Sequence, residues 1–397
     1  MLRILYITTT DPRSRSYGGE QRTNLLWQAL KKYGIVYTLV INDDLEEVFV
    51  DKEHPICFYA SNKYERGWMN FCYRYIQKLT WIPFLPFTYK LNKEISAFFP
   101  GVSFDVLVAR YITNYAKYHL WKIAPSVVDV DDHPLQKFDT SKYAILPIGI
   151  RSIGKKISRI QTYFAFKKMK GGWISNQEQL SICPPSFYYL PNLSIQPSAA
   201  YNSHESDRLY LLTIGLMEYF PNYHGVDYFL TTIWPDFHRK YPQIKYLIGG
   251  KKAPRDYAKR WNAIDGVEYV GFIEDLEKAY QHCIASVIPI DMGAGTCIRV
   301  LETMAYSRIC LSTKFGVRGI SEVDEKLPSG ILLFQTASDF IGQFEKLLNE
   351  DWRQSAESEM SQYFLRHYSK TQFMEGVDQC IKQLSEDNNT TPSSKKC

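Results

Sequence analysis

The chain has 397 residues, of which 45% are hydrophobic and 22% are charged. This length exceeds what one hydrophobic core ordinarily organises, so we expect two domains. The net charge of +5 is too small to indicate a nucleic-acid-binding protein. No apolar run reaches the length of about 18 residues that a membrane-spanning helix needs. The eight scattered cysteines favour reduced thiols, and their spacing with the histidines indicates no metal site.

The first half of the chain alternates between strand-like and helix-like segments. "RILYIT" near the start reads as a first strand rather than a signal peptide, and "GGEQRTNLLWQALKKY" predicts a helix that Gly34 closes. "IVYTLVI" predicts the next strand, and this order is typical of a parallel sheet. Further strands are predicted at residues 104–109, 126–130 and 172–175.

The alternation restarts after a segment rich in proline, serine and asparagine, residues 184–208, which predicts a linker. Strands are then predicted at "LYLLTIG", "IKYLIGG", "VEYVGFI", "IASVIPI" and "ICLST", and "VDYFLTTIWPDFHRKY" predicts one helix. We therefore expect an α/β fold of two Rossmann-like domains, with parallel sheets that face each other across a cleft.

The expected domain boundaries follow from these patterns. Residues 1–195 form the N-terminal domain and residues 205–370 the C-terminal domain. Residues 371–385 form a C-terminal helix that can pack back on the N-terminal domain. The polar residues 386–397 form a disordered tail.

The loop after the first strand carries Gly18 and Gly19 at the start of the predicted helix. Ligands of open parallel sheets bind at the carboxyl ends of the strands. Adjacent glycines let the backbone approach a phosphate, and the amides of a helix N-terminus point toward it. The alternative is an ordinary turn. The GxGxxG pattern of dinucleotide-binding proteins does not occur here.

The segment "VVDVDDHP" places Asp129, Asp131 and Asp132 at or just after the carboxyl end of another strand. Charges at this position favour a role in a site, and the alternative is that Asp131 or Asp132 caps a helix. "DVD" also fits a DxD motif, which would bind a divalent ion through oxygen ligands. His133 is expected to be a loop residue rather than a metal ligand.

The segment "PIDMGAGTCIRVLETMA" predicts a strand, a glycine loop and a helix. The loop contains Gly293 and Gly295, and the amides of Gly295 and Thr296 would form an anion-binding helix start. Arg299 would add a guanidinium for phosphate, and Glu302 could accept hydrogen bonds from two ribose hydroxyls. The alternative is an Arg299–Glu302 surface pair of little energetic value.

This last segment resembles the donor-nucleotide signature of the group 1, or family 4, glycosyltransferases, which have the GT-B fold. "GTCIRVLETMAYSRICLSTKFGVRGI" is similar to the family pattern. "GGEQRTNLLWQAL", "LPN", "IGLMEYFPNYHGVDYFL" and "VGFIEDLEKAYQHCIASVIPI" extend the resemblance over most of residues 1–385. Members of this family transfer a sugar from a nucleotide sugar, usually with retention and without a metal.

The resemblance implies roles for individual residues. Glu302 would hold the ribose of the donor, and Gly19 would face its phosphates. Asp131 aligns best with a position in the acceptor-side loop where many members have a histidine. Gly215, after the first strand of the second domain, joins the expected donor-binding residues.

The chain departs from the family pattern at two places. A glutamate is usual eight residues before Glu302, where this sequence has Ala294. The arginine and lysine that usually follow the first strand of the second domain correspond to Leu216 and Asn222. We expect Arg299 to meet the charge of the donor diphosphate instead.

Residues 151–170 contain seven basic residues and no acidic one, with four apolar side chains on one helical face. Such a helix can lie on an anionic bilayer. In the alternative interpretation, its apolar face packs on the domain and its charges are merely solvated. Residues 64–89, which hold nine aromatic residues with scattered basic ones, are a second candidate for membrane contact.

The expected function is a glycosyltransferase that moves a sugar to a glycan or lipid-linked acceptor in cell-surface polysaccharide synthesis. The alternatives are a non-catalytic nucleotide-sugar-binding module and a nucleotide-sugar epimerase. We expect no cofactor beyond the co-substrate, no metal and no nucleic-acid partner. The expected location is cytoplasmic, with peripheral contact to the inner face of the plasma membrane. The expected catalytic residues are Asp131, Asp132 and Arg299.

Overall fold

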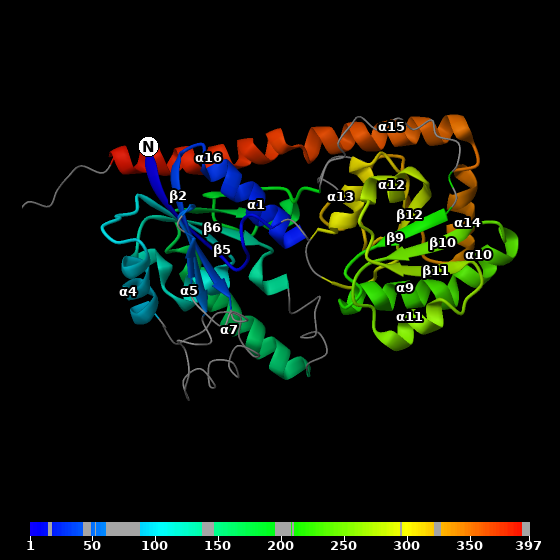
Figure 1. The fold of residues 1–397 in the computed structure, drawn as a ribbon, viewed down its shortest axis with the longest axis horizontal. Coiled ribbons are helices and arrows are strands. Elements are labelled where there is room, and N and C mark those ends of the chain that lie inside the picture. Colours follow the sequence, from blue (N-terminus) through cyan, green and yellow to red (C-terminus); the bar gives the residue numbers. More distant parts are fainter. Residues whose placement is uncertain are drawn as a thin grey trace, which may run out of the picture. The chain divides into compact units, whose positions relative to one another are not determined.

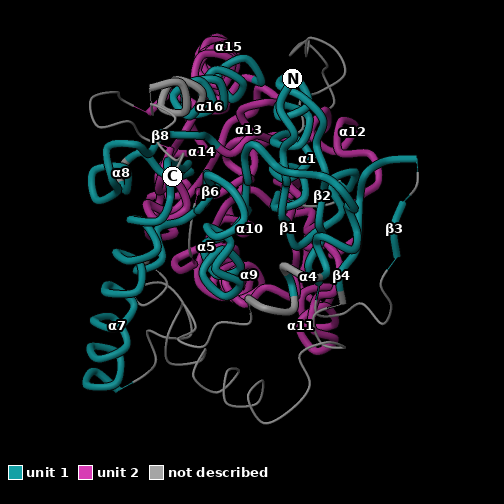
Figure 2. The backbone as a smooth tube through the Cα atoms, turned by 90° about the vertical axis from the view of Figure 1, so that its left-hand side faces the viewer, with its two compact units in different colours: residues 1–191, 370–397 teal, residues 192–369 magenta. Residues whose placement is uncertain are grey.

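The computed structural model describes residues 1–14, 18–42, 49–51, 53–60, 88–136, 147–194, 208, 210–293, 296–320 and 327–390. The chain forms two compact units (Figure 1). Unit 1 comprises Met1–Pro191 and Lys370–Cys397, and unit 2 comprises Asn192–Ser369; Figure 2 draws them in teal and magenta. Each unit is built on one sheet.

Unit 1 contains an eight-stranded sheet in the order β3-β4-β2-β1-β5-β6-β7-β8. Neighbouring strands are parallel except for β3, which pairs antiparallel with β4 at the edge. The chain passes through the middle of the sheet first, because β1 pairs with both β2 and β5. The strands are β1 (Leu2–Thr8), β2 (Gly34–Asn42), β3 (Phe49–Asp51), β4 (Ile56–Ala60), β5 (Val106–Arg110), β6 (Ser126–Asp131), β7 (Gly171–Ile174) and β8 (Phe187–Tyr189).

Helices flank this sheet, and one of them comes from the end of the chain. α16 contacts α1, β7 and β8, and Figure 1 shows it in red beside the blue α1. The indole Nε1 of Trp173, on β7, donates a hydrogen bond to the carbonyl of Gly376 at 3.0 Å. The helices are α1 (Gly18–Leu30), α4 (Thr88–Phe98), α5 (Ile112–Lys117), η1 (Leu120–Lys122), η2 (Pro134–Gln136), α7 (Ile148–Phe166), α8 (Gln177–Leu180) and α16 (Lys370–Thr390).

The sequence predicted that Gly34 closes the first helix, and this prediction is wrong. The helix ends at Leu30, and Gly34 opens strand β2. A Cβ atom on Gly34 would lie 1.9 Å from the carbonyl oxygen of Leu2, in the neighbouring strand. The glycine is therefore required by close contact between two backbones rather than by a left-handed helix end.

Unit 2 contains a six-stranded sheet in the order β11-β10-β9-β12-β13-β14, with all neighbours parallel. The last strand, β14, is a short element that the sequence patterns did not predict. The strands are β9 (Tyr210–Ile214), β10 (Lys245–Gly249), β11 (Val267–Gly271), β12 (Cys283–Ile288), β13 (Cys310–Ser312) and β14 (Ile331–Leu333).

The segment expected as one helix after β9 is two helices that meet at Ile233. Pro235 lies in the first turn of the second helix, where its missing amide cannot continue the hydrogen bonds of the first. The helices of unit 2 are α9 (Phe220–Thr232), α10 (Trp234–Lys240), α11 (Arg255–Trp261), α12 (Leu276–Gln281), α13 (Ile298–Ala305), α14 (Ala337–Lys346) and α15 (Glu350–His367).

The α/β class and the two domains on parallel sheets are confirmed. The polar segment 386–397 differs in part from the expectation of a disordered tail, because α16 continues to Thr390. Residues 391–397 lie outside the described residues, as do residues 195–207 of the expected linker and residues 61–87 of the aromatic segment. Of the described helices, none is long and apolar enough to span a membrane.

Candidate functional site

The carboxyl ends of β5 and β6 meet the start of α1 in unit 1. Arg110 is the last residue of β5 and Asp131 the last of β6. Asp131 has a φ of 65°, a left-handed conformation that is uncommon for a residue other than glycine. The strand thus ends with a carboxylate whose backbone has an unusual conformation. Such conformations cluster at functional sites.

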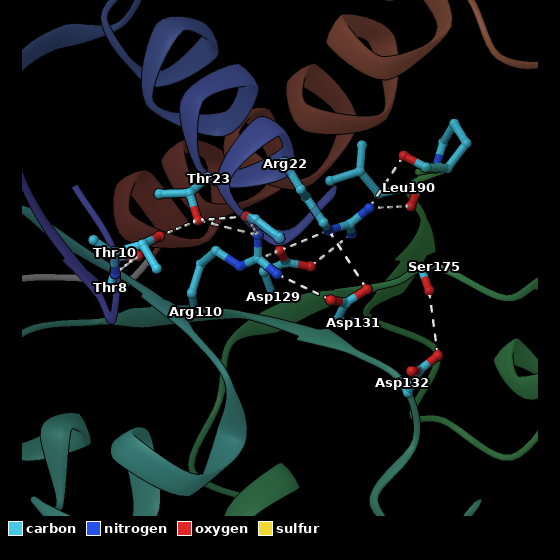
Figure 3. A network of polar contacts seen from close by, with 12 residues as sticks. Thr8, Thr10, Arg22, Thr23, Arg110, Asp129, Asp131, Asp132, Ser175 and Leu190 are labelled. Atoms are coloured by element: carbon cyan, nitrogen blue, oxygen red, sulfur yellow. Dashed lines mark hydrogen bonds and ion pairs between the residues drawn. The ribbon is translucent and has the colours of Figure 1, made fainter. Parts of the chain in front are cut away.

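Two arginines and two aspartates form one buried network at this edge of the sheet (Figure 3). Asp129 accepts hydrogen bonds from Nε and Nη2 of Arg22, at 2.9 Å and 2.7 Å. Nε of Arg110 lies 3.3 Å from the same carboxylate. Nη2 of Arg110 donates to Asp131 at 2.9 Å. Both aspartates were predicted as site residues from the sequence, whereas both arginines were missed.

The members of this network differ in exposure, and that difference separates their roles. The side chain of Asp129 is fully buried, whereas that of Asp131 is 22% exposed. Burial alone would raise the pKa of Asp129, but the guanidiniums of Arg22 and Arg110 outweigh it and hold the pKa below its ordinary value. Asp129 is thus a buried, charged structural partner, and Asp131 is the carboxylate of the network that is partly exposed.

Arg110 also fixes the start of α1, where Gly18 and Gly19 are the first two residues. Its Nη1 donates to the carbonyl of Gly19 at 3.0 Å and lies 3.2 Å from the hydroxyl of Thr23. One arginine therefore couples the glycine turn to Asp131. An arginine that ends an apolar strand, as in "VLVAR", is the signal that sequence reasoning had available.

Asp132 and His133 follow Asp131 but point elsewhere. The hydroxyl of Ser175 lies 3.5 Å from a carboxylate oxygen of Asp132. His133 is buried, and burial lowers the pKa of its imidazole to about 4. Within the described residues, no group of three or more metal-ligating side chains is placed to hold an ion.

In unit 2, Gly215 follows β9 and lies against the side chain of Arg299, which α13 carries. A Cβ on Gly215 would lie 2.9 Å from Nε of Arg299. Nη2 of Arg299 donates to the side-chain oxygen of Asn222, near the start of α9. The amide nitrogen of Asn222 donates in turn to the carbonyl of Leu216 at 2.8 Å. A chain of contacts thus holds one guanidinium at the carboxyl end of the sheet.

A second guanidinium, from Arg318, lies against Gly293. Gly293 has a φ of 134°, and a Cβ there would lie 3.2 Å from Nη2 of Arg318 and 3.5 Å from the hydroxyl of Tyr219. Nη1 of Arg318 donates to the carbonyl of Phe315 at 2.9 Å, and its guanidinium carbon lies 4.1 Å from the centre of the Phe315 ring. Sequence reasoning missed Arg318, although it lies within the "GVRGI" segment.

Glu302 lies one turn beyond Arg299 on α13 and is buried. One of its carboxylate oxygens accepts a hydrogen bond from the hydroxyl of Tyr280 at 3.1 Å. Burial raises the pKa of Glu302, and the Tyr280 hydrogen bond and the charge of Arg299 offset only part of that effect. Tyr280 is itself stacked on Tyr306 with ring centres 4.4 Å apart. The hydrogen bond from Tyr280 therefore orients the Glu302 carboxylate through one of its two oxygens.

The helix after the glycine loop starts later than expected. α13 begins at Ile298, and its N-cap is Cys297, whose backbone is extended and whose side chain makes no capping hydrogen bond. Thr296 is buried and precedes the helix, and Gly295 and Ala294 lie outside the described residues. The amide of Thr296 therefore does not lie in the first turn of the helix, which contains Arg299, and the prediction for Gly295 falls outside the described residues.

One segment of unit 2 is similar to a known family. Residues 208–350 match the model of the family described as glycosyl transferases group 1. No curated protein sequence matches the chain.

Several solved structures share its fold. The sucrose-phosphate synthase of Thermosynechococcus elongatus has a TM-score of 0.67 at 12% identity, over 98% of this chain and 100% of that one. The α,α-trehalose 6-phosphate synthase of Burkholderia multivorans has 0.65 at 11%, over 100% of both chains. HepE of Anabaena, solved with UDP and glucose, has 0.59 at 10%, over 96% and 100%. The protein therefore has the GT-B fold.

Proposed function

We propose that the protein transfers a sugar from a nucleotide-sugar donor to a glycan or lipid-linked acceptor, with retention and without a metal, in cell-surface polysaccharide synthesis. The observation that carries this proposal is the pair of guanidiniums, from Arg299 and Arg318, beside two glycines at the carboxyl end of the unit 2 sheet. That end of a parallel sheet is where such folds bind ligands. The same segment matches the group 1 glycosyltransferases.

The two arginines would bind the donor diphosphate. Gly215 and Gly293 let the side chains of Arg299 and Arg318 lie directly against the backbone, because a side chain at either glycine would crowd the neighbouring guanidinium. A guanidinium binds phosphate oxygens through charged, bidentate hydrogen bonds. A departing nucleoside diphosphate gains negative charge as its bond to the sugar breaks. These contacts would therefore be stronger in the transition state than in the ground state.

Glu302 would bind the ribose. Its position after Arg299 on α13 puts the carboxylate one helical turn from the phosphate-binding guanidinium. Tyr280 occupies only one lone pair of the carboxylate, and the others remain able to accept the two ribose hydroxyls. The ribose does not change during the reaction, so this contact would contribute equally to ground and transition states.

Asp131 would act on the acceptor side. The reaction breaks the bond between the anomeric carbon and the phosphate oxygen and forms a bond from that carbon to an acceptor oxygen, whose proton must leave. A partly exposed carboxylate that Arg110 keeps in place can position the acceptor hydroxyl or offset positive charge that develops at the sugar.

A nucleotide panel tests the donor site. UDP comes first because HepE of Anabaena was solved with UDP and glucose, and ADP, GDP and uridine complete the panel. A ligand at about 100 times its dissociation constant should stabilise the protein by about 2.7 kcal/mol. We expect a nucleoside diphosphate to raise the unfolding temperature and uridine to have a much smaller effect. Arg299→Ala and Arg318→Ala should remove this difference.

Arg255→Ala is the matched control, because Arg255 is an exposed arginine on α11 of the same unit. Equal stabilisation of the wild type and both arginine variants would contradict the proposed donor site. Turnover then separates the candidate functions. Sugar transfer to an acceptor supports the transferase, and tight nucleotide binding without turnover favours the non-catalytic module, which the departures at Leu216 and Asn222 motivate. An isomeric nucleotide sugar formed without acceptor favours the epimerase.

We also propose that the protein works in the cytoplasm at the inner face of the plasma membrane. A lipid-linked acceptor would be presented there. The support for this location is the basic and apolar surface of α7 (Ile148–Phe166) in unit 1.

A further inference from the structure

We propose that α7 lies on an anionic lipid bilayer and inserts its outward apolar side chains among the headgroups. α7 would be the surface that holds the protein at the membrane location proposed above. The biological purpose of this contact rests on the proposed function, whereas its physical basis does not. α7 comprises Ile148–Phe166, and its start extends past the other labelled elements of unit 1 in Figures 1 and 2.

The side of α7 that packs on unit 1 is made mainly of small and polar side chains. Gly154, Ser158, Gln161, Thr162 and Ala165 are buried, together with Phe166 at the end of the helix. Burial of these residues removes far less apolar surface from water than burial of isoleucines would. The helix is therefore inverted relative to an ordinary surface helix, whose apolar stripe faces the core.

The large apolar side chains of α7 point outward instead. Ile153, Ile160 and Phe164 are 61%, 58% and 60% exposed. With Ile157, which is partly exposed, their spacing of three and four residues places them in one stripe along the helix. The exposure of these side chains contradicts the alternative interpretation of the sequence, in which they pack on the domain. Three more large side chains of the helix are exposed: Ile148, Ile150 and Tyr163.

Basic side chains lie next to this stripe. Lys156 and Arg159 are exposed and fall between members of the stripe in the sequence. The ammonium of Lys167 lies 4.5 Å from the centre of the Tyr163 ring, an arrangement of cation and aromatic ring suited to a membrane interface. Residues 147–170 contain no acidic residue, so no carboxylate of this segment itself offsets its positive charge.

Charge and shape together favour a bilayer over a protein partner. A continuous apolar stripe flanked by positive charges on a 19-residue helix matches the chemistry of an interface-bound helix, which places its apolar face at the headgroup boundary and its cations near anionic lipid. Because the apolar stripe runs along the length of α7, the helix would lie parallel to the membrane surface.

Sedimentation with lipid vesicles tests the proposal on the full chain. Vesicles of phosphatidylcholine alone are compared with vesicles in which part of this lipid is replaced by phosphatidylglycerol. We expect binding to the anionic vesicles that weakens as salt is added. The double variant Lys156→Glu/Arg159→Glu should bind at least about fivefold more weakly for each positive charge removed. The triple variant Ile153→Ser/Ile160→Ser/Phe164→Ser should lose binding at all salt concentrations.

Matched controls keep the outcomes distinct. Leu365→Ser removes an exposed apolar side chain from α15, and Arg255→Glu/Lys259→Glu reverses two exposed charges on α11; both should bind like the wild type. Binding that the α7 variants leave unchanged, or no binding to any vesicle, overturns the proposal. A dimer in solution that the triple serine variant dissociates also overturns it, in favour of a second copy on this face. Vesicle binding by a protein without sugar transfer leaves this inference intact and rejects the proposed function.

Discussion

Arg22 and Asp129, 107 positions apart in the sequence, form a two-point ion pair that joins α1 to β6. Arg22 also donates to the carbonyls of Leu190 and Pro191 at 2.9 Å and 3.1 Å. One buried side chain thus ties three parts of unit 1 together, next to Asp131.

Removal of Arg22 should destabilise unit 1 strongly. Arg22→Met leaves the buried charge of Asp129 with only Arg110 to compensate it, and the loss of one partner of a buried pair costs about 3 kcal/mol. Urea unfolding measures this cost. Arg239→Met is the control, because Arg239 and Asp236 form a 2.9 Å pair with exposed side chains, which is worth no more than about 1 kcal/mol. Equal effects of the two substitutions would contradict the role given to Arg22.

Gly215→Ala should impair the donor site without removing a charge. The new methyl group would lie 2.9 Å from Nε of Arg299 and displace the guanidinium. We expect kcat to fall about tenfold or more, toward the value for Arg299→Ala, because the guanidinium contributes mainly to the transition state. Gly342→Ala is the control, since a Cβ there meets no atom within 4 Å. A fully active Gly215→Ala protein would place the diphosphate elsewhere.

Glu302→Gln should raise the KM for the donor and leave kcat nearly unchanged. Glutamine keeps the shape of the side chain but loses the charge that strengthens hydrogen bonds from the ribose, a loss of about 1–3 kcal/mol. Steady-state kinetics with a varied donor concentration give both constants. A fall in kcat at unchanged KM would show that Glu302 takes part in the chemical step instead.

Asp131→Asn should lower kcat by about a hundredfold and change donor affinity little, since Asp131 is proposed to act on the acceptor side. Asp132→Asn is the neighbouring control and should retain more activity. The reverse ranking would move the assignment by one residue. EDTA should leave turnover unchanged, whereas activity lost with EDTA and restored by manganese would favour the DxD interpretation.

His133 should make the folded protein sensitive to acid. Burial lowers the pKa of His133 to about 4, below its ordinary value of 6.5. As the pH falls below 6.5, the unfolded chain takes up a proton that the folded chain does not, so stability is lost between these two values and is unaffected above them. His133→Gln should reduce the loss of stability between pH 7 and pH 5 by about 2 kcal/mol. Identical losses in the two proteins, measured by urea unfolding, would contradict this assignment.

The strand and helix order was largely predictable because long buried strands and amphipathic helices carry clear periodic patterns. β3, β8 and β14 were missed because three residues are too few to show a period. The prediction of a linker over residues 184–208 is wrong at its start, where β8 joins the sheet of unit 1, and the five-residue β4 was also missed. The division of one expected helix at Ile233 was signalled by Pro235, but the surrounding apolar pattern continues through it.

The candidate sites were predictable only where residues lie close together in the sequence. Asp131, Arg299 and Glu302 stand out in short motifs. The partners Arg110 and Arg318 were missed because only the folded sheet brings them to Asp131 and Gly293. The outward direction of the α7 stripe also depends on tertiary packing, because the same pattern fits a helix that packs inward.

The position of α16 has a consequence for the order in which the protein is made. Unit 2 is continuous in sequence, whereas β7 of unit 1 needs Gly376 as the acceptor for Trp173 and lies against Cys380. During synthesis on the ribosome, we therefore expect unit 1 to lack its contacts with α16 until the segment after unit 2 has been made, whereas the sequence of unit 2 is by then already complete.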